Sequence, residues 1–396
     1  MFCAVNPYIR CSKKFLMKKS IFSVFISLVF FSSCSVTHTN TSANNGSINS
    51  LKYLGEYQVP YNQQFKSTTI GGLSGIDYDP KTKQYYLICD DRSQINPARF
   101  YTAKINFSQA GISNVEFVNV TTLLQPNGSA YPERKKDPAH APDPEALRYD
   151  PVINKFVWTS EGERITGKDT VIEQPAITII KKDGKYIDTF SLAPQTIISA
   201  EQKGPRQNGV FEGLAFADNF KTMYISVEEP LYEDGPRAGL EPSDAYTRII
   251  KYNMANHKPV EQFAYRLEPV AHAPVPADAF IINGIPDILS VGKNKLLVIE
   301  RSFSTGRPVC TIRVYITDLS EASDISQLQS LREQSFKHPA AKKLLLNMDD
   351  LGIYIDNIEG VTFGPDLPNG HKTLVFVSDN NFDKLQKTQF LLFEVD

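Results

Sequence analysis

The chain has 396 residues, of which 41% are hydrophobic and 22% are charged. This length can bury a large core, either in one large all-β domain or in two or three smaller domains. The formal net charge of −2 argues against nucleic-acid partners, which need a basic surface. The many Tyr, Phe, Gly and Pro residues suit short strands joined by turns.

The first part of the chain has the features of an export signal. Met17 is the expected start, because two lysines follow it and residues 21–31 are apolar but too short to span a bilayer. The apolar run ends in Ser-Ser-Cys, which resembles a bacterial lipoprotein signal in which Cys34 becomes the lipid-bearing residue. A plain secretory signal cut near Ser33 is the alternative.

The chain therefore divides into an upstream extension and signal (1–34), a flexible polar tether (35–50) and a folded domain (51–396). Either signal places the domain outside the cytoplasm, as a periplasmic or surface lipoprotein or a secreted protein. Contact with a membrane is expected only through the lipid on Cys34. The domain keeps Cys89 and Cys310, and both lie in apolar strand-like runs, which favours buried free thiols over a disulfide.

Five segments repeat one pattern, with first residues at positions 74, 145, 212, 283 and 359. Each has a polar residue, a small residue, an apolar run, a turn rich in Asp, Pro, Asn, Gly and Lys, a second apolar run and a closing polar or acidic residue. This pattern predicts a β-hairpin. Further strand-like runs follow the hairpins, at 100–107, 115–120, 176–181, 185–192, 247–252, 260–266 and 311–317.

Repeated units of four antiparallel strands predict an all-β fold, a β-propeller. Five motifs favour five blades, and a sixth, degenerate blade within 302–357 is the alternative. The last unit is one strand short and the run 51–59 has no hairpin partner, so we expect this N-terminal strand to close the last blade. Residues 233–245 are expected to form a rim loop, and residues 325–346 a partly helical insertion.

The acidic residues of the repeats are expected to meet at one mouth of the propeller. In an antiparallel hairpin the start of the first strand lies beside the end of the second, so Glu212 should neighbour Glu228. The first strands of the blades line the central channel, so these ends should converge around one axis. We expect calcium there, because it accepts oxygen ligands in irregular geometry and no histidine recurs in the motif to favour zinc or copper. The expected metal ligands are Asp90, Asp91, Glu161, Glu163, Glu229, Glu300 and Asp379. For any single acidic residue, the alternative is a solvated strand end.

Five stretches of the repeats are distinctive, namely GLSGIDYD (72–79), DPEAL (143–147), FEGLA (211–215), LVIERSF (297–303) and above all IEGVTFGPDLPNGHKTLVFVSDNNF (358–382). They resemble the bacterial phytase-like family, whose description is esterase-like activity of phytase. The resemblance extends over roughly residues 55–396 and implies a secreted hydrolase of esters or phosphoesters, similar to calcium-dependent β-propeller phytases. It carries no catalytic nucleophile over to this chain.

The expected function is thus hydrolysis of phosphoesters or carboxylic esters by a monomer, through calcium at the acidic mouth. The catalytic candidates are Glu145, Glu212, Glu228, Glu359 and His140. Arginine binds phosphate with two donors, and the candidates for substrate binding are Arg92, Arg164, Arg301 and Arg307. Each arginine could instead pair with a neighbouring carboxylate, and a lone loop histidine such as His140 is more often a surface residue.

Two alternatives remain at this point. A non-enzymatic propeller could hold a ligand or protein partner with structural calcium, because the fold alone does not determine function. A lactonase-like propeller is a third option within the enzyme class. A serine hydrolase is disfavoured, because the sequence has no Gly-x-Ser-x-Gly elbow.

Overall fold

A computed structural model of the chain describes residues 48–396. The predicted export signal and the lipid site at Cys34 lie outside these residues, as does most of the predicted tether. In the part that the structure describes, we find no helix with the length and apolar character needed to cross a membrane.

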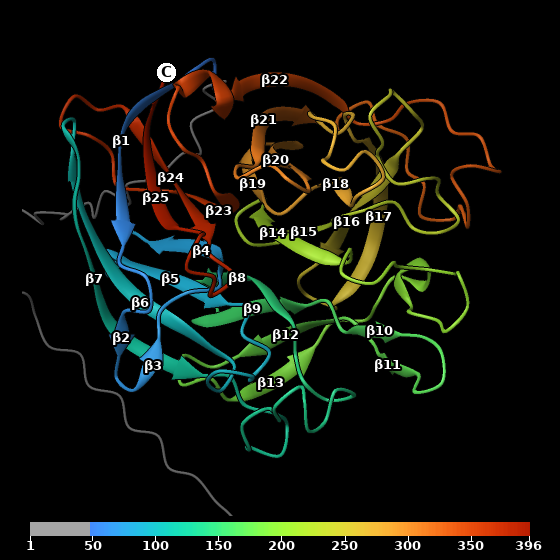
Figure 1. Cartoon of the computed structure of the whole chain (residues 1–396), viewed down its shortest axis with the longest axis horizontal. Helices are drawn as coiled ribbons and strands as arrows, with labels where there is room; N and C mark the ends of the chain where they lie inside the picture. The colour runs from blue at the N-terminus through green and yellow to red at the C-terminus, as the bar shows by residue number, and fades with distance from the viewer. Residues whose placement is uncertain (1–47) are drawn as a thin grey trace, which may run out of the picture. The chain divides into compact units, whose positions relative to one another are not determined.

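Five antiparallel sheets surround a central axis, which confirms the predicted five-bladed propeller (Figure 1). Blade one, from the axis outward, contains β4 (Leu73–Asp79), β5 (Gln84–Cys89), β6 (Arg99–Ser108) and β7 (Gly111–Thr122). Blade two contains β8 (Pro144–Asp150), β9 (Lys155–Ser160), β12 (Ala176–Ile180) and β13 (Tyr186–Thr189). Blade three contains β14 (Phe211–Ala217), β15 (Thr222–Val227), β16 (Tyr246–Asn253) and β17 (Lys258–Arg266).

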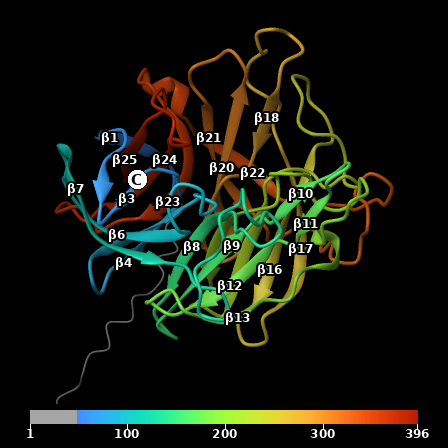
Figure 2. The ribbon, with the colours of Figure 1, turned by 60° about the horizontal axis from the view of Figure 1, so that its bottom comes forward.

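Blade four differs from the others because its innermost strand is interrupted. It contains β18 (Ile281–Gly284), β19 (Ile288–Gly292), β20 (Lys295–Ser304), β21 (Thr311–Asp318) and β22 (Ala341–Asn347). Both β18 and β19 pair with the long strand β20. Figure 2 shows β18 and β20 extending past the other strands at the top of the view.

The last blade is closed by the N-terminal strand, as predicted. Blade five contains β23 (Asn357–Phe363), β24 (Lys372–Asp379), β25 (Thr388–Val395) and β1 (Leu51–Val59). Leu51 pairs with Val395, so the two ends of the domain lie in one sheet. Two short hairpins and two 3-10 turns complete the elements, namely β2 (Gln64–Phe65) with β3 (Thr68–Thr69), β10 (Glu163–Ile165) with β11 (Val171–Glu173), η1 (Pro194–Thr196) and η2 (Met348–Leu351).

One alternative and one expectation about the C-terminal half were wrong. Residues 302–357 hold no sixth blade, because β21 and β22 from this stretch complete blade four. Residues 325–346 form no helix, and their last part is the outer strand β22. Leu328 and Leu331 of this segment pack with Ile325 and Ala264 in a small hydrophobic cluster. The insertion 233–245 is a loop without strands, as expected.

The core lies between blades rather than in one centre. Each of five large hydrophobic clusters joins two neighbouring blades; for example, one cluster places Trp158 of blade two with Phe100 of blade one. Both faces of each sheet therefore need apolar residues, which explains why the strands read as continuous apolar runs. Cys89 and Cys310 are buried free thiols in this core.

A β-bulge occurs at the same point of four innermost strands. The pairing register shifts across the opening residue of the motif, which is Ser74, Glu145, Glu212 or Glu359. A bulge bends the strand and redirects a side chain. The repeated polar residue is therefore turned toward the axis by the same backbone device in each of these blades.

A buried arginine joins all five innermost strands. Arg148 of β8 is 3% exposed, and its guanidinium group binds both carboxylate oxygens of Asp287, at 2.9 and 2.7 Å. It also donates to backbone carbonyl groups of the other four blades, those of Ile76, Leu214, Ile288 and Val361. Asp287 in turn accepts the backbone N–H of Val361 at 2.9 Å. This pair closes the channel and fixes the positions of the strands around it.

Substitution of Arg148 tests this role. We expect Arg148→Met to lower the free energy of unfolding by about 3 to 5 kcal/mol, because it leaves Asp287 buried without its partner and four carbonyl groups without a donor. Urea denaturation followed by tryptophan fluorescence measures the change. Arg332→Met, at an exposed arginine, is the matched control and should change stability by less than about 0.5 kcal/mol. An equal, small effect of both variants would contradict the role of Arg148.

Candidate functional site

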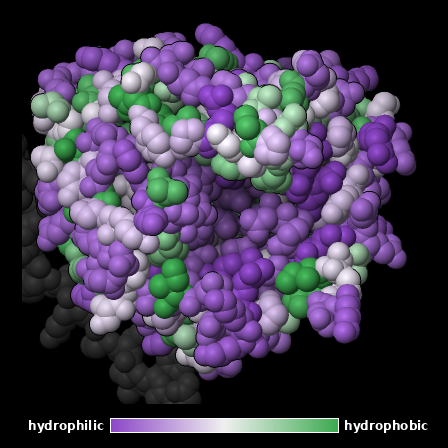
Figure 3. Space-filling view, viewed as in Figure 1, coloured by the Kyte–Doolittle hydropathy of each residue, from purple (hydrophilic) through white to green (hydrophobic). Residues whose placement is uncertain are grey.

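A cavity of about 770 Å³ opens at the end of the axis where the acidic residues meet. Nine acidic residues and three arginines are among the residues that line it. In the space-filling view, a hollow surrounded mainly by hydrophilic residues lies near the middle of the molecule (Figure 3). The prediction that the repeated strand ends converge on one mouth is confirmed for Asp90, Glu145, Glu212, Glu228, Glu359 and Asp379.

Two carboxylate triads share one residue in this region. The first contains Asp143, Glu145 and Glu161, and the second contains Glu161, Glu212 and Glu228. Within each triad, one oxygen from each residue lies within 4.8 Å of the others. All five residues are buried. In blades two and three, the acid that opens the hairpin therefore lies beside the acid that closes it, as strand pairing predicted.

The positive charge at the triads does not balance the negative charge. Asp143 forms an ion pair with Arg92 at 3.1 Å, and Glu228 pairs with Arg301 at 2.6 Å. In the described part of the chain, no basic side chain forms an ion pair with Glu145, Glu161 or Glu212. One oxygen of Glu161 accepts the N–H of Val210, whereas the other, Oε2, is buried without a hydrogen-bond partner.

The pKa values of these carboxyl groups reflect this imbalance. Burial, reinforced by the charge of Glu212, raises the pKa of Glu145 well above its usual range. Burial likewise raises the pKa of Glu161, with Asp143 and Glu228 adding to the effect, and that of Glu212, beside Glu161 and Glu228. These groups must either hold protons or share a cation.

The residues present fit a hard cation such as calcium. Oxygen atoms separated by up to 4.8 Å can be bridged by calcium–oxygen bonds of about 2.3–2.6 Å. The donor set contains only carboxylates, which suit calcium or magnesium and not a soft metal. The buried Oε2 atom of Glu161 accepts no hydrogen bond, so it is available to bind a cation. In the described residues of this cavity, no histidine contributes to the lining.

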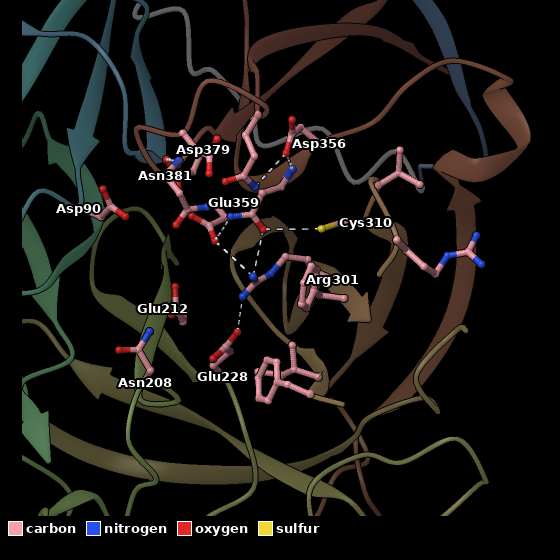
Figure 4. Close-up of a pocket in the computed structure, with 18 of the residues that line it drawn as sticks. Asp90, Asn208, Glu212, Glu228, Arg301, Cys310, Asp356, Glu359, Asp379 and Asn381 are labelled. Atoms are coloured by element: carbon pink, nitrogen blue, oxygen red, sulfur yellow. Dashed lines mark hydrogen bonds and ion pairs between the residues drawn. The ribbon is translucent and has the colours of Figure 1, made fainter. Parts of the chain in front are cut away.

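Arg301 lies between the carboxylates of blades three and five (Figure 4). Its guanidinium group contacts Glu228, donates to Asn357 Oδ1 at 3.0 Å, and lies 3.6 Å from Glu359 Oε1. Glu359 Oε1 also accepts from Asn357 at 2.8 Å, whereas no hydrogen bond within residues 48–396 reaches its Oε2. Burial raises the pKa of Glu359 to about 8, although Arg301 opposes the shift.

Glycine makes room for these carboxylates at two points. Gly72 has φ +60°, and a side chain there would collide with the carboxylate of Asp90. A Cβ atom at Gly284 of blade four would lie 2.6 Å from Cγ of Glu228. Gly284, the small residue of the repeat in blade four, therefore marks a position where an acid of blade three passes close to the backbone, whereas Gly72 makes room for an acid of its own blade.

Blade one lacks the opening acid, and its serine takes the equivalent place. Ser74 is 3% exposed, and its hydroxyl group is buried without a hydrogen-bond partner. Blade four also differs, because Asn283 donates to Glu300 and not toward the cavity. The concentration of carboxylates thus falls on blades two, three and five.

Three predicted metal ligands are held by other protein groups. Asp91 accepts the N–H groups of residues 94–96 and pairs with Arg99 at 2.8 Å, so it organises the following loop. Glu163 pairs with Arg92 and Arg134 and accepts from Gln207. Glu300 lies outside the cavity lining and accepts hydrogen bonds from Tyr265, Asn283 and Lys342. Three further predicted ligands line the cavity, namely Asp90, Asp379 and Glu229, which pairs with Arg237. The seventh, Glu161, belongs to both triads.

The predicted substrate-binding residues also separate into two groups. Arg301 and Arg307 line the cavity. Arg92 instead joins blades one and two, through Asp143 and Glu163. Arg164 donates to the carbonyl groups of residues 199–201, in a loop away from the lining. His140 is exposed and pairs with Asp137, so the structure does not bring it to the acidic mouth.

Sequence reasoning missed several residues of the site. Asp143 directly precedes the second motif, and its place two residues before Glu145 was the available signal. Asp356 and Asn357 sit just before the fifth motif and line the cavity. Arg237 comes from the loop insertion 233–245, where no repeat exists to mark it.

Comparison with known proteins agrees with this architecture. A family model described as phytase-like, with esterase-like activity of phytase, matches residues 68–382. The chain belongs to the phytase-like family. No curated protein matches it.

Solved structures resemble the phytase-like propeller only weakly. They include the periplasmic gluconolactonase of Pseudomonas aeruginosa (9% identity, 81% of this chain, 84% of that chain, TM-score 0.35). A putative 6-phosphogluconolactonase from Bacteroides uniformis shows 12% identity over 81% of this chain and 80% of that chain, with a TM-score of 0.34. An exo-β-1,3-galactanase from Phanerochaete chrysosporium shows 10% identity over 86% of this chain and 65% of that chain, with a TM-score of 0.43. These similarities carry no argument about activity.

The raised pKa values predict how stability depends on pH without metal. Burial raises the pKa of Asp143 and Asp379 to about 6, of Glu229 to about 7 and of Glu359 to about 8. These values exceed those of the unfolded chain, about 3.9 for Asp and 4.3 for Glu, so the protonated groups favour folding. Stability is therefore fully present below about pH 4 and is lost as the pH rises through 6 to 8.

Thermal denaturation in chelator between pH 5 and 8.5 measures this dependence, and we expect the melting temperature to fall with increasing pH. Glu359→Gln is the matched variant, because its amide oxygen can still accept from Asn357 but cannot ionise. It should lose the part of the decrease near pH 8. A melting temperature that rises across this range would contradict the assigned direction.

Proposed function

We propose that this phytase-like propeller is an extracytoplasmic hydrolase of phosphoesters or carboxylic esters that acts through calcium at the acidic mouth. The observation that carries the proposal is the pair of buried carboxylate triads sharing Glu161, with three of their five members lacking a basic partner. Family membership supports the reaction class, because the family is described by its esterase-like activity of phytase.

The residues that would hold calcium are the two triads, with Glu161 shared between them. Bound calcium would supply positive charge to oxygen atoms of the substrate and lower the pKa of a water molecule. Because their pKa values are raised, the carboxyl groups of the triads hold protons in the metal-free site. Binding of a cation therefore releases protons.

Glu359 is suited to move a proton. Its carboxyl group lines the cavity, and its Oε1 is occupied by Asn357, which leaves Oε2 to carry the proton. In the metal-free site, a pKa of about 8 keeps this group protonated at neutral pH. We propose that Glu359, which is outside both triads, keeps this proton when calcium binds and donates it to the leaving oxygen of an ester. Arg301 lies 3.6 Å away and would hold the resulting carboxylate in position.

Two arginines would help to bind the substrate. Arg301 lines the cavity but is already paired with Glu228, so its main effect is to orient that carboxylate. Arg307 lines the cavity, is exposed, and has no ion pair within the described residues. It is therefore the guanidinium group available to bind an anionic group of the substrate.

We further propose that the protein is a monomer and that lipid on Cys34 tethers it to the membrane.

Calcium dependence tests the proposal directly. We expect residues 35–396 to hydrolyse p-nitrophenyl phosphate or p-nitrophenyl acetate with calcium and to lose this turnover in chelator. Glu161→Gln should weaken calcium binding by on the order of 100-fold, because even an outer-shell partner of a metal ligand is worth about 10- to 100-fold. Calcium titration monitored by melting temperature gives the affinity independently of turnover.

Two control variants accompany this measurement. Glu300→Gln removes a buried carboxylate outside the cavity, and Glu116→Gln removes an exposed one on β7, and both should keep the calcium response. Turnover that survives chelation would overturn the metal mechanism. Absence of turnover together with a calcium-induced rise in melting temperature would favour a non-enzymatic binding propeller.

The proposed anchor makes a separate prediction. In bacterial cells, the full chain should incorporate labelled palmitate and fractionate with membranes, because Cys34 becomes the acylated N-terminus. Cys34→Ser should abolish the label and release the protein, whereas Cys310→Ser should change neither. Label on the Cys34→Ser variant would contradict the anchor.

A further inference from the structure

One wall of the cavity is apolar. Most of its residues come from blade four, from β18 and β20 and the loop after β20, and Leu385 comes from the loop between β24 and β25 of blade five. Figure 2 shows that β18 and β20 extend beyond the other strands. Phe280 lies directly before β18 and is 52% exposed, and its ring centroid is 6.3 Å from that of Phe303 on β20. Ile282 pairs with Phe303 in the sheet. The apolar residues of the lining are Phe280, Ile282, Phe303, Pro308, Val309 and Leu385.

The acidic and apolar parts occupy different depths. Glu145 and Glu212 are 8% and 7% exposed, whereas Phe280 and Leu385 are 52% and 77% exposed. Glu145 and Glu212 therefore lie at the inner end of the cavity, and Phe280 and Leu385 lie at its outer end. Two lining residues differ from this division, because Ile282 is buried and Asp383 is exposed. Exposed aromatic and leucine side chains beside a deep polar site are typical of a surface that receives an apolar part of a ligand.

Free positive charge is scarce in this cavity. The lining contains nine acidic residues but only three arginines. Arg301 is paired with Glu228 and Arg237 with Glu229, so only Arg307, among the described lining residues, is a basic side chain without an ion pair. The six phosphate groups of inositol hexakisphosphate, the substrate that defines phytases, carry a charge of roughly −9 to −12 at pH 7. One free arginine and the cations held by two triads cannot balance such a charge.

We infer that the substrate carries a single head group, either a phosphate ester or a carboxylic ester, on an aryl or alkyl group. It is not a polyphosphorylated polyol. This inference rests on the proposed function. The head group reaches the acidic, cation-binding end of the cavity, whereas the exposed Arg307 lies beside Pro308 and Val309 at the outer end. The apolar group lies against Phe280 and Phe303. Selectivity then comes from the apolar wall, and the reaction from the inner carboxylates.

Binding of two phosphonates tests the wall without requiring turnover. Phosphonates resemble both a phosphate ester and the tetrahedral intermediate of carboxylic ester hydrolysis. In calcium, we expect phenylphosphonate to bind more tightly than methylphosphonate, measured by isothermal titration calorimetry with residues 35–396. Phe280→Ala should weaken phenylphosphonate binding by about 2- to 12-fold, the range expected for loss of one aromatic contact. It should leave methylphosphonate binding unchanged.

Phe220→Ala is the matched control, because this partly exposed ring lies in the turn of the blade-three hairpin, at the end opposite Glu212 and Glu228. It should leave the binding of both phosphonates unchanged. Equal binding of the two phosphonates, or an unchanged preference in Phe280→Ala, would overturn the inference. Tighter binding of inositol hexakisphosphate than of phenylphosphonate would overturn it as well.

Turnover separates the inference from the function on which it rests. With calcium, we expect kcat/KM for p-nitrophenyl phosphate or p-nitrophenyl acetate to exceed that for inositol hexakisphosphate, and Phe280→Ala to act mainly through KM. Hydrolysis of inositol hexakisphosphate in preference to both small esters supports a hydrolase but overturns the assigned substrate class. A phenyl preference in binding without hydrolysis of any ester supports the apolar subsite and counts against the hydrolase.

Discussion

The innermost strand of each blade is an edge strand, and the propeller depends on how these five edges are satisfied. Four of the strands direct a backbone carbonyl group at the guanidinium group of Arg148, and the fifth carries Arg148 itself. Asp287 balances the charge and binds the blade-five strand through Val361 N–H. An unpaired edge inside a protein would leave polar groups without partners. One guanidinium group with several fixed donors satisfies a carbonyl group in each of the other four blades, which a lysine could not do.

This closure also determines the chemistry of the mouth. Glu145 lies on the same strand as Arg148, three residues nearer the cavity, so a strand fixed by the arginine is fixed for the carboxylate as well. The bulges then turn Glu145, Glu212 and Glu359 toward one another. Holding buried carboxylates this close opposes folding unless they bind protons or a cation. The rigid ring below them supplies the stability that such a concentration of charge requires.

The sequence was sufficient for the fold because the hairpin repeat is both regular and long. It placed Glu145, Glu161, Glu212 and Glu228 together through strand pairing alone. It could not show that Glu300 is turned away from the mouth, because the break between β18 and β19 in blade four has no signature in the pattern. Arg148 was also missed, since a charged residue in an alternating strand usually faces water. Its role depends on carbonyl groups from four distant segments, which no local pattern reveals.

The pairing of β1 with β25 has a consequence for biosynthesis. Blade five combines the first strand of the domain with the last three, so it cannot form until the final residues have been synthesised. Glu359 and Asp379 belong to this blade and come to the mouth only then. A chain that ends early keeps an open ring, exposed sheet edges and an incomplete set of carboxylates. Synthesis of β25 is therefore the step that must precede assembly of the site.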